Sequence, residues 1–283
     1  MQRKTQIAII GAGNLANALA VSLVRAGYPI AAVISRRGGK SLDRARRLAN
    51  EVGSRAQAGS REITADIFWI CVPDAEIAHA ASALAEEPMG KRKIAFHSSG
   101  ALTSDEMGAL RKRGLSTASV HPLMTFVRSS RPSLAGVPFA LEGDLRAVRA
   151  AKSIVRNLGG AAYSIRKKDK VAYHAWGSFA SPMLTSLLAT SERVAALAGV
   201  KPNEARRRMI PILLQTLANY ASFGAPGAFS GPIVRGDVDT VRRHLQELRG
   251  APAAREAYIA LARAALRCLP AKNKPALKRL LSS

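Results

Sequence analysis

The stretch Ile7-Ala8-Ile9-Ile10-Gly11-Ala12-Gly13-Asn14-Leu15-Ala16 decides the fold of this chain. An apolar run ends at Ile10, two glycines follow, and an alanine-rich segment from Asn14 to Ala26 has the composition of a helix. Strand, glycine turn and helix in this order are typical of a dinucleotide-binding unit, because the glycines permit a tight turn and let backbone N–H groups approach a pyrophosphate. A glycine turn without a ligand is the alternative. The expected cofactor-binding residues here are Gly11, Gly13, Asn14 and Leu15.

The end of the second expected strand, Ile30 to Ile34, selects between the two nicotinamide nucleotides. An NAD site places Asp or Glu there to hydrogen-bond the ribose 2′-hydroxyl. Here Ser35, Arg36 and Arg37 follow the strand, and the first acidic residue is Asp43. Guanidinium groups make bidentate, charge-assisted bonds to phosphate. We therefore expect NADP, with its 2′-phosphate at these three residues; a solvated basic loop is the alternative.

Length and composition favour an ordinary intracellular protein. The chain has 283 residues, and 48% of them are apolar, which is enough for two domains with a sizeable core. Its two cysteines, Cys71 and Cys268, are far apart and provide neither a disulfide framework nor a metal cluster. No apolar run approaches the ~20 residues that span a bilayer. We expect a cytoplasmic protein with no metal and no membrane partner.

The formal net charge of +24 raises the question of nucleic-acid binding. The arginines are scattered along the chain, and no zinc spacing, recognition helix or aromatic stripe accompanies them. They are typical of solvated helix faces, so we expect no nucleic-acid partner, although nucleic-acid binding stays a third hypothesis. The charge also attracts anionic substrates and NADP at low salt.

Strand and helix signals alternate up to about residue 165 and then stop. The alternation predicts an α/β fold with a doubly wound, mostly parallel Rossmann-type sheet whose ligands lie at the carboxyl ends of the strands. The helical signals that follow predict an all-α domain. We expect an NADP-binding domain over 1–166 and a helical substrate and dimerisation domain over 167–283. Further strands are predicted near 56 and at 67–72, 93–96, 117–120, 138–141 and 161–165, and late helices at 168–197, 203–223, 237–248 and 253–269.

Three polar clusters fall where the ligand edge of this sheet is expected. Val72, Pro73 and Asp74 follow a buried strand and are expected near the nicotinamide ribose; Asp74 also starts a helix. The turn after His97 offers the hydroxyls of Ser98 and Ser99 to a substrate carboxylate or carbonyl; a plain loop with a helix cap at Ser104 is the alternative. His121 ends its strand directly before Pro122, where the chain must turn. Its imidazole can be a substrate ligand or a buried partner of the backbone.

The helix expected from Lys168 carries a polar stripe, because Lys170, His174, Ser178 and Ser181 are spaced by four, four and three residues. Reduction of a carbonyl by NADPH requires a proton donor for the developing alkoxide. His174 is our first candidate and Lys170 the second; Lys170 can instead belong to a solvated basic helix start.

In the loop Ser230 to Asp237, Arg235 can bind an anionic substrate group, and Asp237 can cap the next helix.

Almost the whole chain resembles a bacterial family of Rossmann-like NADP oxidoreductases whose C-terminal half is a domain of unknown function, related to the helical domain of 6-phosphogluconate dehydrogenase. Some members resemble ketopantoate reductase, and the relatives include pyrroline-5-carboxylate reductase, which forms dimers through its helical domain. The resemblance implies a homodimer and a ketopantoate-like substrate. It rests on the glycine turn and on the segments His97–Leu102, His121–Phe126, Ala172–Ala175 and Gly231–Asp237.

One position departs from the family. Pro182 follows Ala180-Ser181 where family members often carry Asn, and proline should kink the helix because it lacks an N–H group. We therefore hold two hypotheses besides nucleic-acid binding. The first is an NADPH-dependent reductase of a small anionic keto acid or imine, and the second is a nucleotide-binding regulator or scaffold without turnover.

Overall fold

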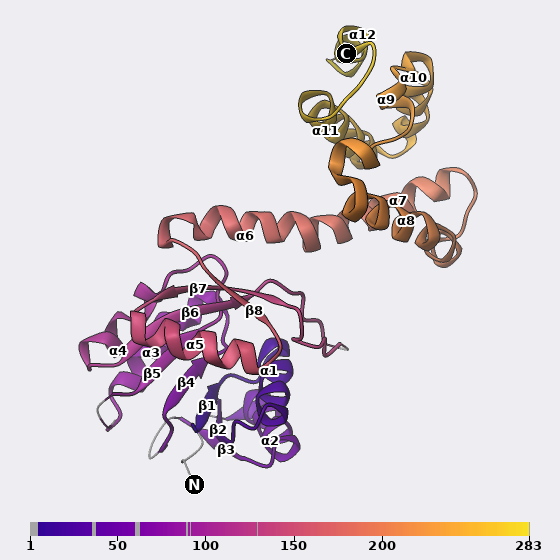
Figure 1. The fold of residues 1–283 in the computed structure, drawn as a ribbon. Coiled ribbons are helices and arrows are strands. Elements are labelled where there is room, and N and C mark those ends of the chain that lie inside the picture. The colour runs from indigo at the N-terminus through magenta and orange to yellow at the C-terminus, as the bar shows by residue number, and fades with distance from the viewer. Residues whose placement is uncertain are drawn as a thin grey trace. The chain divides into compact units, whose positions relative to one another are not determined.

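The computed structural model describes residues 5–35, 38–59, 63–88, 90, 92–128 and 130–282. The chain divides into two compact units, Met1–Ser178 and Phe179–Ser283. The first unit contains an eight-stranded sheet with helices, and the described part of the second is helical (Figure 1). The predicted α/β fold with a helical C-terminal region is confirmed.

The sheet has the order β3-β2-β1-β4-β5-β6-β7-β8, and every neighbouring pair is parallel except β6 and β7. The strand order changes direction between β1 and β4, which is the place where open α/β sheets bind ligands. The strands are β1 Ile7–Ile10, β2 Ile30–Ser35, β3 Arg55–Ala58, β4 Ile67–Ile70, β5 Ile94–His97, β6 Ser116–Pro122, β7 Pro138–Gly143 and β8 Ala161–Ser164.

Helices cover both faces of the sheet. Ile7 and Ile9 point into the core under α1, α2 and α5, whereas Ala8 and Ile10 point into the core under α3 and α4. This alternation, with both sets apolar, is the pattern of a parallel strand that is buried on both faces. The helices of this unit are α1 Asn14–Arg25, α2 Gly39–Glu51, α3 Ile77–Ala85, α4 Gly108–Lys112, α5 Leu145–Asn157 and α6 Lys170–Ser178.

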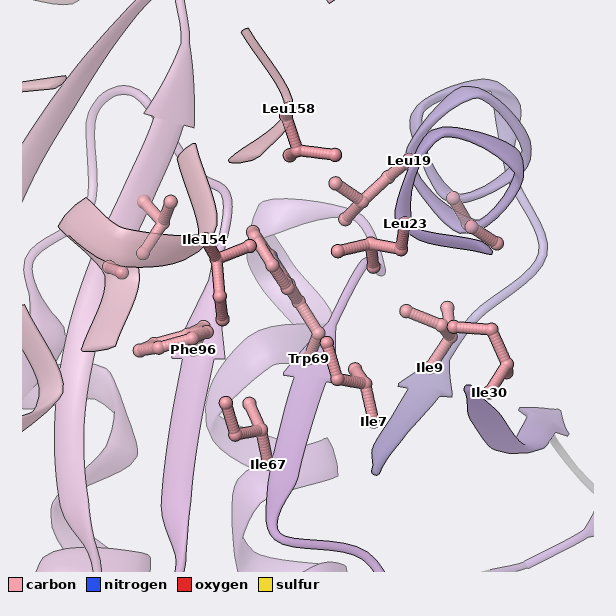
Figure 2. Packing of buried hydrophobic residues seen from close by; sticks show 14 of the residues in the cluster. Ile7, Ile9, Leu19, Leu23, Ile30, Ile67, Trp69, Phe96, Ile154 and Leu158 are labelled. Carbon is pink, nitrogen blue, oxygen red and sulfur yellow. The ribbon is translucent and has the colours of Figure 1, made fainter. Parts of the chain in front are cut away.

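The larger core is built around two aromatic rings. Trp69 of β4 and Phe96 of β5 meet edge to face with ring centroids 5.1 Å apart, and neither is exposed. Leu19 and Leu23 of α1 and Ile154 of α5 surround them (Figure 2).

The second unit has a core where α10, α11 and α12 meet, formed by Val241, Leu245, Ala262, Leu266, Leu277 and Leu281. Its helices α7 and α8 carry many large apolar side chains that remain exposed. The helices are α7 Leu184–Leu197, α8 Pro202–Ala228, α9 Pro232–Arg235, α10 Val238–Glu247, α11 Pro252–Cys268 and α12 Lys274–Ser282. No helix of the described residues is long and apolar enough to cross a membrane.

Three details differ from the sequence-based expectation. Strand β6 continues through His121 and Pro122, because both residues pair with the antiparallel strand β7. The long helix expected over 168–197 begins at Lys170, and a π-helical turn at Phe179–Met183, around Pro182, separates α6 from α7. Helix α6 falls in the first compact unit, whereas the expected boundary at residue 166 assigned it to the second domain.

The aromatic core generates a stability prediction. Phe96→Ala should lower the free energy of unfolding by about 3–5 kcal/mol, because it removes a fully buried ring and leaves a cavity beside Trp69. Urea unfolding followed by circular dichroism measures the change. Val24→Ala, at an exposed position of α1, is the control and should stay within about 0.5 kcal/mol of the wild type. Equal losses in the two variants would contradict this account of the core.

Candidate active site

Both neighbouring strands hold the glycine turn between β1 and α1. The Gly11 N–H donates to the carbonyl of Ile34 in β2 at 2.8 Å. On the other side, a Cβ at Gly11 would lie 2.4 Å from the carbonyl oxygen of Cys71, which follows β4, and the φ of Gly11 is +105°. Only glycine fits here, because any side chain would collide with backbone and strain the turn.

The start of α1 is open to an anion. Gly13 is the N-cap, its side-chain position faces open space, and no side chain caps the helix. The first turn of α1 contains no acidic residue. The first N–H groups of the helix and its partial positive charge therefore fit a phosphate, as the sequence predicts.

The turn borders a cavity of about 1540 Å³ at the carboxyl edge of the sheet. Leu15 and Asp74, also predicted to bind the cofactor, do not line this cavity. Arg36 and Arg37 lie outside the described residues, so their assignment to the 2′-phosphate stays a prediction. The predicted residues that line the cavity are Gly11, Gly13, Asn14, Ser35, Val72 and Pro73.

Helix α2 adds a basic wall that sequence analysis missed. Lys40, Arg44 and Arg47 all line the cavity and are spaced so that they share one helix face. Their spacing directly after the second strand was the available signal. They bring positive charge to the side of the cavity where β2 ends, next to Ser35.

The hydroxyl of Ser99 is committed to its own turn. Ser99 is buried, its Oγ donates to Asp74 at 2.7 Å, and it accepts the N–H groups of Ala101 at 3.2 Å and Leu102 at 2.9 Å. Asp74 therefore braces the turn from the end of β4 and does not cap its own helical turn. Ser98 is half-buried and accepts the indole N–H of Trp69 at 2.9 Å, which leaves its own proton available for a ligand.

Lys170 lies beneath this turn. Its side chain has no exposed surface, and its Nζ donates to the carbonyl of Ser99 at 3.0 Å and to Oγ of Ser119 at 2.7 Å. Burial lowers the pKa of Lys170 to about 8, although the carboxylates of Glu142 and Asp74 act in the opposite direction. The buried position is not that of a solvated helix start.

Two further buried polar side chains, His97 and Glu142, hold the backbone of the segment that follows β5. His97 Nδ1 accepts the N–H of Ser99 at 3.1 Å, so its Nε2 carries the proton and faces the carbonyl of Thr103 at 3.0 Å. Burial lowers the pKa of His97 to about 4, which keeps the ring neutral. Glu142 accepts both the N–H and the hydroxyl of Ser104, at 2.7 and 2.9 Å. The alternative interpretation of this turn placed a helix cap at Ser104, but Thr103 caps that helical turn.

Two imidazoles meet over Gly100. A Cβ on Gly100 would lie 2.5 Å from Cδ2 of His174 and 2.8 Å from Nε2 of His121. Tyr173 fixes His121 from behind, with its hydroxyl 2.8 Å from Nδ1. Burial and the positive charge of Lys170 lower the pKa of His121 to about 3. The two rings also differ in exposure, because His121 is half-buried and His174 is exposed.

Comparison with known proteins agrees with this geometry. Residues 6–95 match the family "NADP oxidoreductase coenzyme F420-dependent", and residues 137–265 match a domain of unknown function, DUF2520. The chain therefore contains a Rossmann-like domain of the first family followed by a domain of the second. No curated protein matches it significantly.

Solved structures share the fold over nearly the whole chain. A Bacteroides fragilis protein, provisionally assigned as an NADP oxidoreductase, is 24% identical with a TM-score of 0.76 and covers 92% of this chain and 97% of its own. An imine reductase from Pseudomonas sp. is 20% identical with a TM-score of 0.65, covering 99% and 100%. A reductive aminase from Aspergillus terreus in complex with NADPH is 15% identical with a TM-score of 0.67, covering 94% of each.

Arg235 lies in the second unit, on a segment of constrained shape. Gly236 has a φ of +73°, and a Cβ there would lie 2.8 Å from the backbone of Lys272. Asp237 caps α10 by accepting the N–H of Thr240 at 3.1 Å, as the alternative reading of this loop predicted. Arg235 is exposed on the four-residue helix α9. Its role toward a substrate stays a prediction.

Within the described ranges, no group of three or more His, Cys, Asp or Glu side chains could hold a metal ion.

Buried Lys170 generates a prediction about pH. Its pKa falls from 10.5 in the unfolded chain to about 8 in the folded one. Between these values the unfolded chain binds more protons, so the stability of the wild type gains a contribution as pH rises from 8 to 10.5. Lys170→Met should lack that gain, which amounts to about 3 kcal/mol.

Urea unfolding of both proteins at pH 7.5 and pH 10 measures this difference, and the other titrating groups cancel in the comparison. Lys168→Met, at an exposed lysine two residues away, is the control and should follow the wild type. Parallel stability curves for the wild type and Lys170→Met would rule out a lowered pKa for the buried ammonium.

Proposed function

We propose that this chain reduces the carbonyl or imine group of a small anionic substrate, such as a keto acid of the ketopantoate type. When bound, NADPH supplies a hydride from C4 of the nicotinamide to the substrate carbon. His174 supplies the proton that the carbonyl oxygen or imine nitrogen requires, so the two-electron reduction is balanced. The names of the imine reductase and the reductive aminase among the structural neighbours support this substrate class.

The observation that carries the proposal is the exposed His174 ring over Gly100, on the same sheet edge as the uncapped start of α1. The strands β1, β4, β5 and β6 are consecutive neighbours in the sheet. The residues at their carboxyl ends therefore lie along one edge in this order: the glycine turn, Val72-Pro73, Ser98 and His121. A cofactor phosphate at α1 and a substrate near Ser98 then occupy one edge of one sheet.

The two histidines have different roles in this proposal. His121 stays neutral down to a pH of about 3, so it is not the proton donor at neutral pH. The Tyr173 hydroxyl lies 2.8 Å from Nδ1 of His121. We propose that it donates to Nδ1, so that His121 presents an Nε2–H toward Gly100 and hydrogen-bonds the reacting oxygen or nitrogen. His174, in contrast, is exposed to solvent.

Lys170 and the two serines also have separate roles. Lys170 acts as a positioning residue, because its ammonium group is buried against Ser99 and Ser119 and does not face a substrate. Ser99 supports the turn from within. Ser98, whose hydroxyl accepts the indole N–H of Trp69 and can donate its own proton, orients the substrate acid.

A nucleotide-binding regulator without turnover is the second candidate. Pro182, in the position where the family often has Asn, favours it, because a proline side chain cannot hold a substrate or nicotinamide amide group. We further place the enzyme in the cytoplasm, on the basis of its two separated cysteines.

A turnover experiment separates the two candidates. We expect steady NADPH oxidation with a panel of 2-keto acids and cyclic imines, and a kcat about 10²–10⁴-fold lower for His174→Ala, because a general acid contributes that much. Val171→Ala, at an exposed position on the same helix, should retain the wild-type kcat. Full turnover by His174→Ala would exclude it as the donor, and NADPH binding without oxidation of any substrate would favour the regulator.

We also propose a homodimer formed through α7 and α8. Ile212 and Phe223 of α8 are each 67% exposed, and Ile210, Leu214, Leu217 and Tyr220 of the same helix are exposed as well. So many exposed large apolar side chains on one helix pair exceed what a monomer usually leaves in water, and a second copy can bury them.

Sedimentation equilibrium should give twice the chain mass of 30.0 kDa. The double variant Ile212→Glu/Phe223→Glu should sediment as a monomer, because charges in an apolar interface oppose association. Val24→Glu, at an exposed apolar position of α1, should stay dimeric. A monomeric wild type would contradict the proposal.

A further inference from the structure

The segment after β6 crosses the start of α1. The side-chain nitrogen of Asn14, the first residue of α1, donates to the carbonyl oxygen of Phe126 at 3.1 Å. Phe126 itself is half-buried and packs against the larger core. These two contacts attach the segment to the glycine turn, although it lies 112 residues further along the chain.

Two arginines of this segment line the same cavity as Gly13 and Asn14. Arg131 forms an ion pair with Glu51 at the end of α2. Arg128 is exposed and forms no hydrogen bond or ion pair with any residue that the structure describes. A guanidinium that lines a cofactor cavity without a carboxylate partner is available to an anion.

We propose that Arg128 binds the pyrophosphate of the cofactor, opposite the N-terminus of α1. Arg128 follows Phe126 by two residues, and the Phe126 carbonyl is bonded to the residue that begins α1. From this position, an extended arginine side chain can contact a phosphate that is bound at the N-terminus of α1. The N–H groups of α1 then bind one side of the pyrophosphate, and the guanidinium neutralises the other.

The 2′-phosphate of NADPH is the other anionic group that Arg128 could bind, but the expected position of that phosphate argues against this assignment. That phosphate is expected where β2 ends and α2 begins, beside Ser35 and Lys40. The segment that carries Arg128 is instead bonded to the start of α1 through Phe126 and to the far end of α2 through Arg131 and Glu51. The assignment rests on the cofactor placement of the proposed function, so the test must separate the pyrophosphate, the 2′-phosphate and a failure of nucleotide binding.

The test compares the Kd of NADPH, NADH and 2′-AMP, measured by isothermal titration calorimetry on the full chain. Arg128→Ala should weaken NADPH and NADH by the same factor, about 10–100-fold, because both carry the pyrophosphate. The Kd of 2′-AMP, which lacks the pyrophosphate, should not change. Lys40→Ala should weaken NADPH and 2′-AMP and leave NADH unchanged.

Arg131→Ala is the matched control, since Arg131 lies in the same segment and lines the same cavity but is paired with Glu51. It should change each Kd less than threefold, and both arginine variants should unfold at the wild-type urea midpoint. An unchanged Kd for Arg128→Ala, a loss confined to NADPH, or an equal loss in Arg131→Ala would each overturn the assignment. If the wild type binds neither NADPH nor NADH, the proposed function fails and this assignment fails with it.

Discussion

The cofactor end of this protein depends on one close approach between two backbones. Gly11 passes so near the carbonyl of Cys71 that a Cβ would lie 2.4 Å from that oxygen. Because the turn is pressed against the end of β4 and hydrogen-bonded to β2, the start of α1 is held at the switch point of the sheet. The helix terminus stays uncapped at that place. A phosphate ligand can therefore use N–H groups whose positions are set before it arrives.

A buried polar network performs the equivalent task at the substrate end. The ammonium group of Lys170 joins α6 to β5 and β6 through Ser99 and Ser119, and Asp74 joins the same turn to β4. An unpaired buried ammonium group would be costly, so each of these bonds matters for the stability of the arrangement. Lys170 is also the first residue of α6, and His174 is one helical turn further along that helix. Stability and the position of the candidate proton donor thus have a common origin.

Local patterns predicted the elements well and the roles of single side chains less well. The glycine turn, the apolar strands and the cap by Asp237 depend on residues close in sequence, and the structure confirms these elements. The hydroxyl of Ser99 was expected to face a ligand, but it is bonded to Asp74, which is 25 residues away. Lys40, Arg44 and Arg47 were missed, because their common role appears only when α2 is placed beside the cavity. Likewise, β6 extends past its expected end because β7, an antiparallel partner, pairs with His121 and Pro122.

The sequence by itself determined that this chain folds as a dinucleotide-binding α/β unit followed by helices. The reason is that the positions of glycines and the periodicity of apolar residues act on the conformation of short stretches of the chain. It also determined the choice of candidate histidine, because His174 is the imidazole on the expected helix. Only the tertiary structure decided that Lys170 is buried, that His121 is neutral and that His174 lies over Gly100. Burial, and with it the proton affinity of a side chain, is created by residues from distant parts of the chain and has no counterpart in any short stretch of it.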